Sequence, residues 1–327
     1  MMMKQLSKIL IAALAALGVS LAFAQQLPGP IVTADWLAAN QAQVQLVDVR
    51  SDTKSYSRQS VTSVDKKTGK VQVEEVGGVI PGALLVDYAL VRSEKLFDGQ
   101  KTKYLIPDRE ELESRLRAAG LRSDKPIVIA ALGLDPSDVV EALRLYWTLK
   151  VFGEDRVAVL DGGSAGWLAS GRTLSPAASA KPAPGNWTAK GYRAALIAGS
   201  ADVEQASKSA RPLLIDGRES ASFYGLTKRS YVNQYGHIAN ARSLPPELMF
   251  RSAQGVQYFL TRAQYQTLAK LSGIDAAAPA ISYCNSGNLA SGAWFVFSEL
   301  LGNSNVKLYD GSLYLWSREG RPLVGVL

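Results

Sequence analysis

The residue best suited to covalent chemistry is Cys284, the only cysteine in the chain. An apolar run from Ala280 to Tyr283 leads directly into it, and a short polar stretch follows, Asn285-Ser286-Gly287-Asn288-Leu289. A cysteine at the carboxyl end of a buried parallel strand lies where open α/β proteins bind their ligands. The Asn and Ser residues of the stretch form turns well and pack poorly in cores. We therefore interpret Cys284 as a nucleophile and not as a packing residue.

The loop after Cys284 favours a negatively charged sulfur. Backbone N–H groups of residues 285–289 are expected to converge on the sulfur, and the amino end of the next helix adds positive potential. Both effects favour the thiolate, which is the nucleophilic form of cysteine. They would equally stabilise an anionic persulfide. Because no second cysteine is present, a persulfide on Cys284 cannot be resolved into an intramolecular disulfide.

An internal duplication surrounds this site. Three patterns occur once in each half of the chain. Asp48-x-Arg50 is repeated as Asp216-x-Arg218, and Gly78–Ala83 is repeated as Gly236–Ala241. Asp161-Gly-Gly, followed by Trp167, is repeated as Asp310-Gly, followed by Trp316. The offset between the halves is a constant 149 residues from Gly153 to Trp167. Extended to the cysteine, this offset makes Asp135 its counterpart. Repeats of this length indicate duplicated domains rather than solenoid units.

Each half alternates short apolar strands with helices, which predicts an α/β fold with a mostly parallel sheet flanked by helices. The expected strands are 127–130, 212–215, 280–283 and 306–309, and the expected helices are 139–152, 261–271 and 291–301. The predicted organisation is an N-terminal domain at 25–174, a Pro/Ala/Ser-rich linker at 175–190 and a C-terminal domain at 191–327. The segment Ser51–Gly77 is expected to be an inserted surface hairpin with its turn near Gly69.

The first 24 residues are typical of a secretory signal peptide. Lys4 and Lys8 precede an apolar stretch that ends in the small-x-small site Ala22-Phe23-Ala24. Cleavage before Gln25 would place the mature protein in the periplasm. No later segment is long and apolar enough to span a membrane, so we expect no stable membrane association after the signal is removed.

Composition limits the other partners. The chain is 47% hydrophobic, an ordinary globular value, and its net charge of +7 comes from Lys and Arg dispersed among Asp and Glu. Without a basic run, nucleic-acid binding is not expected. One cysteine and one histidine offer no metal-ligand cluster, so no metal and no organic cofactor are predicted.

These motifs, in this order and over nearly all of residues 25–327, resemble the tandem-domain rhodaneses, the thiosulfate and 3-mercaptopyruvate sulfurtransferases. The resemblance implies two rhodanese-like domains in a pseudo-twofold arrangement, a silent N-terminal domain, and a cleft between them with Cys284 at its floor. It also implies a six-residue active loop, Cys284 to Leu289. The implied reaction is ping-pong sulfur transfer from a small donor, through a Cys284 persulfide, to a thiol or cyanide.

The chain departs from the family at the donor-binding positions. Asn285-Ser286 is nearer to the Gly-Ser of mercaptopyruvate-preferring members than to the basic residues of thiosulfate-preferring ones. The family's substrate-binding arginine, four residues after Arg218, is replaced by Ser222. Lys228 or Arg229 is a candidate replacement, and we include Arg229 with Arg218 and residues 285–289 among the predicted substrate-binding residues. Arg218 itself is expected to hold the active loop.

Three other functions compete with sulfur transfer. A related phosphatase loop would carry Arg six residues after the cysteine, where this chain has Ala290. A Cys–His hydrolase would need His237, the only histidine, beside Cys284, whereas the Gly-His-Ile motif indicates a structural histidine. The third alternative is a non-catalytic rhodanese-like scaffold of the periplasm, which the missing arginine favours and the well-formed cysteine loop disfavours.

Overall fold

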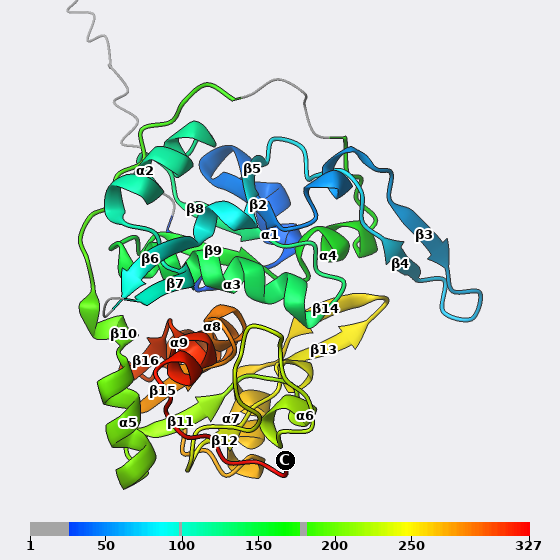
Figure 1. The fold of residues 1–327 in the computed structure, drawn as a ribbon. Coiled ribbons are helices and arrows are strands. Elements are labelled where there is room, and N and C mark those ends of the chain that lie inside the picture. The colour runs from blue at the N-terminus through cyan, green and yellow to red at the C-terminus, as the bar shows by residue number, and fades with distance from the viewer. Residues whose placement is uncertain (1–25, 98–99, 177–181) are drawn as a thin grey trace, which may run out of the picture.

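The computed structural model describes residues 26–97, 100–176 and 182–327, which fold into two halves, each built on a five-stranded sheet (Figure 1). The predicted signal peptide (1–24) and residues 177–181 of the predicted linker lie outside the described residues. The sheet orders are β1-β9-β8-β2-β5 and β10-β16-β15-β11-β12, and all pairings within them are parallel. The predicted α/β fold class is therefore confirmed.

The two sheets are alike in plan. The first contains β1 (Ile31–Val32), β2 (Gln45–Arg50), β5 (Leu84–Asp87), β8 (Ile127–Ala130) and β9 (Val157–Leu160). The second contains β10 (Ile197–Ala198), β11 (Leu213–Asp216), β12 (Arg242–Ser243), β15 (Ala280–Tyr283) and β16 (Val306–Tyr309). The inner strands β8 and β15 are buried along their whole length, because helices cover both faces of each sheet.

Helices connect the strands. Those of the first half are α1 (Ala34–Asn40), α2 (Arg109–Ala118), α3 (Pro136–Val151) and α4 (Gly163–Ala169). Those of the second half are α5 (Ser200–Ser209), α6 (Ser220–Phe223), α7 (Arg262–Leu271), α8 (Asn288–Phe295), which continues as a π-helical turn (Val296–Leu300), and α9 (Ser312–Arg318). No helix of the described residues is long and apolar enough to cross a membrane.

Two helices begin earlier than the sequence pattern predicts, and both beginnings bear on the site. The helix expected at 139–152 starts at Pro136, because the Asp135 side chain accepts hydrogen bonds from the amides of Ser137 and Asp138 and caps it. The helix expected at 291–301 starts at Asn288, directly after Gly287. Gly287 has a φ of 76°, the left-handed conformation that glycine adopts readily and that turns the chain into the helix.

The strand register corrects the predicted counterpart of the cysteine. On β2, Asp48 pairs with Ala130, and on β11, Asp216 pairs with Tyr283. Cys284 therefore corresponds to Ala131 and not to Asp135. The constant offset of 149 fails here because the first half has a longer loop after the strand and a longer helix after the loop.

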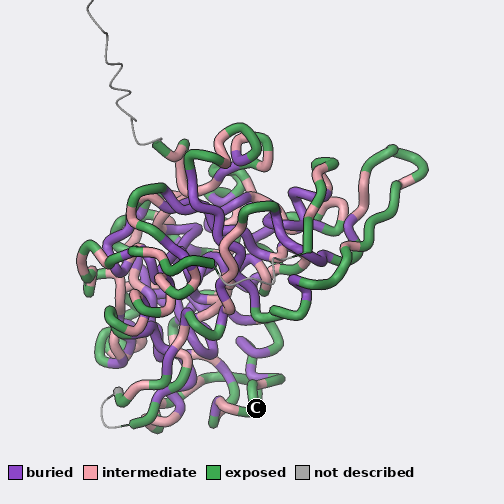
Figure 2. Tube along the Cα trace, turned by 90° about the horizontal axis from the view of Figure 1, so that it is seen from above, coloured by how far each residue is buried: buried purple, intermediate pink, exposed green. Residues whose placement is uncertain are grey.

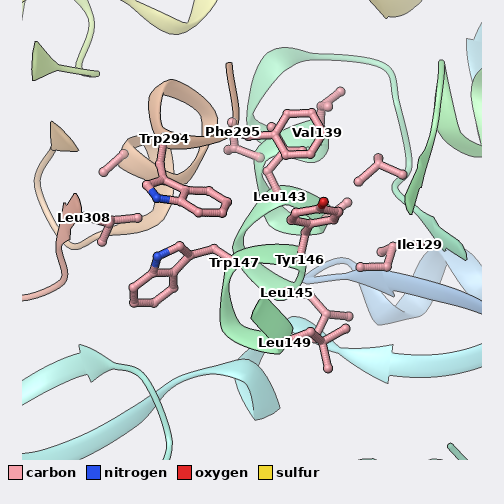
Figure 3. Close-up of a cluster of buried hydrophobic side chains, with 14 of the residues drawn as sticks. Ile129, Val139, Leu143, Leu145, Tyr146, Trp147, Leu149, Trp294, Phe295 and Leu308 are labelled. Atoms are coloured by element: carbon pink, nitrogen blue, oxygen red, sulfur yellow. The ribbon is translucent and has the colours of Figure 1, made fainter. Parts of the chain in front are cut away.

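One apolar core joins the two halves. Helices α3 and α8 pack against each other, so that Tyr146 meets Phe295 edge-to-face with ring centroids 4.9 Å apart (Figure 3). Trp147 and Trp294 are fully buried in the same cluster. Buried residues accordingly fill the middle of the molecule, and exposed residues lie on the outer loops (Figure 2).

Three antiparallel hairpins decorate the sheets: β3 (Val61–Val64) with β4 (Val71–Glu75), β6 (Ser93–Phe97) with β7 (Gln100–Leu105), and β13 (Phe250–Ala253) with β14 (Val256–Phe259). The first is the hairpin expected in the 51–77 insertion, and it projects from the molecule (Figure 1). Its strand β4 also meets the turn of the third hairpin. The Val73 amide donates to the Gln254 carbonyl at 2.9 Å, and the Gln254 side chain donates to the Val71 carbonyl at 2.7 Å.

Candidate functional site

Cys284 lies at the carboxyl end of β15, on the side of the second half that faces the first. It is the first residue after the strand, and three residues separate it from the start of α8. The sequence predicts a thiol on the floor of a cleft. In this structure the residue is only 1% exposed, because segments of both halves cover it.

Ser312 fixes the two ends of the cysteine loop. Its Oγ accepts hydrogen bonds from the amides of Cys284 and Gly287, each at 3.1 Å, and donates to the Tyr309 carbonyl at 2.8 Å. The amides of Leu313 and Tyr314 donate to the carbonyls of Cys284 and Asn285. The start of α9 thus holds the loop through its backbone.

Ser312 adopts a strained conformation to do this. Its φ is 46°, in the left-handed region that residues other than glycine rarely occupy. The equivalent residue of the first half is Gly163, with a φ of 56°. The second half therefore carries a serine where the first half has the unstrained residue. Such strain is typical of functional sites, where surrounding interactions maintain it.

Several polar groups of the loop remain free to bind a ligand. Among the described residues, the amides of Asn285 and Ser286 have no acceptor, and the first amides of α8 have none within the helix. The Asn285 side-chain oxygen is also buried without a partner. Unpaired N–H groups at a helix start bind anions, so the loop can stabilise a thiolate or persulfide.

The first half supplies side chains that hold the loop. Arg144 of α3, fully buried, donates to the Gly287 carbonyl at 3.1 Å and forms an ion pair with Asp310 at 2.6 Å. The other Asp310 oxygen accepts from the Ile106 amide at 2.7 Å. Because Asp310 directly precedes the Gly311-Ser312 turn, one ion pair across the domain boundary positions both the loop and the residue that fixes it.

Tyr88 and Arg92 make further contacts from the first half. The Tyr88 hydroxyl donates to the Asn288 side chain at 2.6 Å, and Arg92 donates to the Ser286 carbonyl at 2.5 Å. Burial raises the pKa of Tyr88 to about 12, and Cys284 is among the charges that act on it. Tyr88 therefore stays protonated and lies close enough to Cys284 to respond to a charge there.

Three tyrosines cluster over the loop from both halves. The ring of Tyr104, on β7, lies 5.5 Å from those of Tyr231 and Tyr314. Arg92 stacks on Tyr104, and Arg318 stacks on Tyr314. Burial raises the pKa of Tyr231, with Ser286 and nearby arginines opposing the rise and Cys284 adding to it. The cluster therefore borders the cysteine.

The predicted substrate-binding residues separate into two groups. Residues 285–289 surround Cys284, whereas Arg218 is 1% exposed, pairs with Asp216 and donates to the Gly236 carbonyl. None of the hydrogen bonds seen for its side chain reaches the loop, where Arg218 was expected to act. Arg229 has a side chain 57% exposed and pairs with Glu219 at 3.3 Å.

Lys228 and His237, the other two candidates, make hydrogen bonds to groups other than the cysteine loop. Lys228 donates to the Val232 carbonyl at 3.0 Å, and Ser222, at the position of the missing arginine, contacts Thr227. The His237 ring stacks on Phe223 at 3.8 Å, and its Nδ1 lies 2.8 Å from the Phe223 carbonyl. These contacts agree with a structural histidine. Within the described residues, no cluster of three His, Cys, Asp or Glu side chains could hold a metal ion.

Five residues of the site were not predicted from the sequence: Tyr88, Arg92, Arg144, Tyr231 and Ser312. Two had a signal. Arg144 is a lone cation inside an apolar helical run, and Ser312 replaces the second glycine of the first half's Asp-Gly-Gly motif. Tyr88 and Arg92 had none, because only the packing of the two halves brings them to the loop. No local pattern marks Tyr231, which belongs to the same half as Cys284.

Comparisons with known proteins agree with this architecture. Residues 33–170 and 200–319 match the family model of the rhodanese-like domain. A Mycobacterium leprae protein, named provisionally as a thiosulfate sulfurtransferase, is 30% identical over 311 residues, covering 90% of this chain and 96% of the relative. The 3-mercaptopyruvate sulfurtransferase of Escherichia coli K12 is 27% identical over 289 residues, covering 87% and 94%.

A solved structure supports the same fold. The crystal structure of SseA from Escherichia coli, described as a rhodanese fold of 3-mercaptopyruvate sulfotransferases, superposes with a TM-score of 0.68 at 24% identity, covering 87% of this chain and 98% of that one. Two regions of the chain match the family model, and the two sheets have the same plan. The relatives are matched over nearly their whole length. The chain belongs to the rhodanese-like family, carries two of its domains, and has sulfurtransferases among its relatives.

Proposed function

We propose that the protein is a sulfurtransferase that carries sulfane sulfur on Cys284. The observation that carries this proposal is the loop itself. The only cysteine of the chain stands at the carboxyl end of a central strand, beside unpaired amides and the start of a helix. Such surroundings favour a thiolate and, after transfer, an anionic persulfide.

The proposed reaction has two half-reactions. The Cys284 thiolate attacks the outer sulfur of a donor such as thiosulfate; a bond from Cys284 to that sulfur forms, the donor's S–S bond breaks, and sulfite leaves with the electron pair. With 3-mercaptopyruvate a C–S bond breaks instead, and the carbon takes up the thiol proton to give pyruvate. A thiolate or cyanide then removes the outer sulfur and restores Cys284. The names of the relatives suggest both donors.

Intact mass measurement tests the proposal. The protein comprising residues 25–327 is incubated separately with thiosulfate and with 3-mercaptopyruvate, and Cys284→Ser serves as the control. We expect a gain of one sulfur atom that is absent in the control and reversed by cyanide. If a folded sample gains no sulfur from either donor, the scaffold function becomes the better account of the chain.

Export to the periplasm is a second part of the proposal. It is supported by the basic start, the apolar stretch and the small-x-small site of the first 24 residues. Fractionation of cells that express the full chain is expected to recover a protein beginning at Gln25 in the periplasm. A protein that keeps its first 24 residues in the cytoplasm would contradict this part alone.

A further inference from the structure

A sulfur donor with a negative charge needs a cation near Cys284, and most arginines around the loop are already engaged. Arg218 and Arg144 are buried and paired with Asp216 and Asp310. Arg229 is paired with Glu219 at the surface. An ion pair with a carboxylate leaves little net charge for a ligand, so these three side chains are poorly suited to bind an anion.

Arg318 has no carboxylate partner among the described residues either, but it bonds to the carbonyls of Tyr231 and Tyr314. Arg92 is different, because its positive charge is uncompensated and it bonds directly to the cysteine loop. Across residues 26–97, 100–176 and 182–327, no carboxylate lies within ion-pair distance of it. Its Nη2 donates to the Ser286 carbonyl at 2.5 Å, and its Nε donates to the Tyr104 carbonyl at 3.3 Å. The guanidinium also lies 4.5 Å from the centre of the Tyr104 ring.

These contacts leave part of the guanidinium available. In the described part of the chain, Nη1 of Arg92 has no partner, and the side chain is only partly buried. The orientation is already fixed by two carbonyls and an aromatic ring, so little conformational entropy is lost when a ligand binds. The N–H groups of Nη1 can donate charge-assisted hydrogen bonds to an oxygen of a carboxylate or a sulfonate.

Arg92 also contacts the cysteine loop at a residue close to Cys284. It bonds to Ser286, two residues after Cys284, and two residues of chain span at most about 7 Å. The phenols of Tyr88 and Tyr231 are each within electrostatic reach of both Arg92 and Cys284. The cation and Cys284 therefore lie near the same two phenols, with one contributed by each half.

We propose that Arg92 binds the anionic group of the sulfur donor while Cys284 attacks its outer sulfur. The proposal rests on the sulfurtransferase function proposed above and names the residue that recognises the sulfonate or carboxylate of the donors proposed there. Arg92 takes no part in bond making. It holds the sulfite oxygens, or the carboxylate of 3-mercaptopyruvate, as the bond to sulfur breaks. The half without a cysteine then contributes directly to donor recognition.

The test compares Arg92→Gln, Arg92→Lys and Arg229→Gln, with Arg122→Gln as a control. Arg122 is an exposed arginine before β8, at the opposite end of the strands. Steady-state kinetics with each donor should show KM raised roughly 10- to 100-fold in Arg92→Gln, with a smaller change in kcat. Arg92→Lys should recover part of the loss, and Arg122→Gln should match the wild type.

Binding without chemistry separates this inference from the proposed function. Calorimetric titration of thiosulfate into Cys284→Ser protein measures donor affinity whether or not sulfur is transferred. Arg92→Gln in that background should weaken affinity by the same factor. An unchanged affinity, a loss of kcat alone, or a rise of KM in Arg229→Gln instead would overturn the assignment. Failure of sulfur loading by the wild type would refute only the proposed function.

Discussion

At the residue scale, the position of Ser312 explains how the loop around the nucleophile is held. Its hydroxyl is the common acceptor for the amides at both ends of the loop, Cys284 and Gly287. A serine in the left-handed conformation costs on the order of 1 kcal/mol, and the hydrogen bonds of its hydroxyl offset that cost. We therefore regard Ser312 as a positioning residue for Cys284.

Two substitutions of Ser312 separate its contributions. Ser312→Ala removes the hydroxyl but keeps the strain, so we expect a loss of about 1–3 kcal/mol in the free energy of unfolding and slower sulfur transfer. Ser312→Gly also removes the hydroxyl but relieves the strain. Urea unfolding should therefore show that Ser312→Gly is more stable than Ser312→Ala. The kcat of sulfur transfer should be lowered equally in both variants. A Gly variant with wild-type kcat would remove Ser312 from the site.

Cys284 could be proposed as the nucleophile from the sequence, whereas its neighbours in the structure could not be predicted. Cys284 stands out because a buried strand leads into it and no other cysteine is present. Arg229 is a candidate because its loop, residues 225–235, could fold over the cleft, and it remains a prediction. Arg92 lies 194 residues before Ser286, and no local pattern connects the two. Contacts between duplicated halves are a property of their packing, which short-range sequence patterns do not encode.

At the scale of single elements, helix α3 carries both a side chain that holds the cysteine loop and two carboxyl groups whose pKa is raised. Its middle carries Arg144, which bonds to the cysteine loop, and its first turns carry Asp138 and Glu141. Burial raises the pKa of Asp138 to about 6 and that of Glu141 to about 7. Glu141 also accepts hydrogen bonds from the amide and the hydroxyl of Ser51. The start of α3 is therefore a place where the fold accommodates a protonated carboxyl better than an ionised one.

The raised pKa of Glu141 predicts a pH dependence of stability. The folded-state value of about 7 lies above the ordinary value of 4.5, so its contribution to stability is complete below pH 4.5 and is lost as pH rises through 7. Glu141→Gln cannot ionise. The stability that the variant gains over the wild type should therefore be larger at pH 8 than at pH 4.5, by at most about 3 kcal/mol in the free energy of unfolding. Melting temperatures measured at the two pH values check this.

The control for this prediction is Glu110→Gln, on the exposed side of α2. It should follow the wild type across the same pH range. A Glu141→Gln variant whose advantage does not change between pH 4.5 and 8 would contradict the prediction.

Sequence patterns located the elements well and their ends less well. Strands β8, β15 and β16 have the predicted bounds, because continuous apolar runs mark buried parallel strands. Helix α8 begins three residues before its predicted start. Its first turn contains Asn288 and Leu289, which were assigned to the loop because polar residues follow the cysteine. The difference matters, since it brings the amino end of the helix closer to the sulfur.

At the scale of the whole molecule, the two halves are joined at both the core and the periphery. Helices α3 and α8 share one apolar cluster, and the hydroxyl of Tyr146 donates to Glu299 at 2.7 Å. Away from this core, the inserted hairpin β3–β4 contacts the turn of β13–β14. The insertion thus acts as a brace between the halves, a role that its sequence did not suggest.

A pair of glycine substitutions tests the brace. A Cβ on Gly255 would lie 2.1 Å from the Val73 carbonyl, whereas one on Gly273 would meet nothing within 4 Å. Both glycines have a positive φ, so alanine strains the backbone similarly at each. Gly255→Ala should therefore be less stable than Gly273→Ala by about 1–3 kcal/mol, and hydrogen exchange of the Val73 amide should accelerate.

The cysteine loop lies elsewhere, so under the proposed function Gly255→Ala should keep its kcat for sulfur transfer. Equal stabilities of the two alanine variants, together with unchanged exchange at Val73, would show that the hairpin contact contributes nothing to the union of the halves.

The bonds from the first half to the loop also bear on how a duplicated domain evolves. A copy without its own nucleophile is expected to drift, yet Tyr88, Arg92 and Arg144 each bond to the loop from 143 to 200 residues away. A substitution at any of them acts on a cysteine that its own half does not contain. Selection for the shape of that loop therefore extends into the half without a cysteine, and after duplication neither half can be lost without affecting the other.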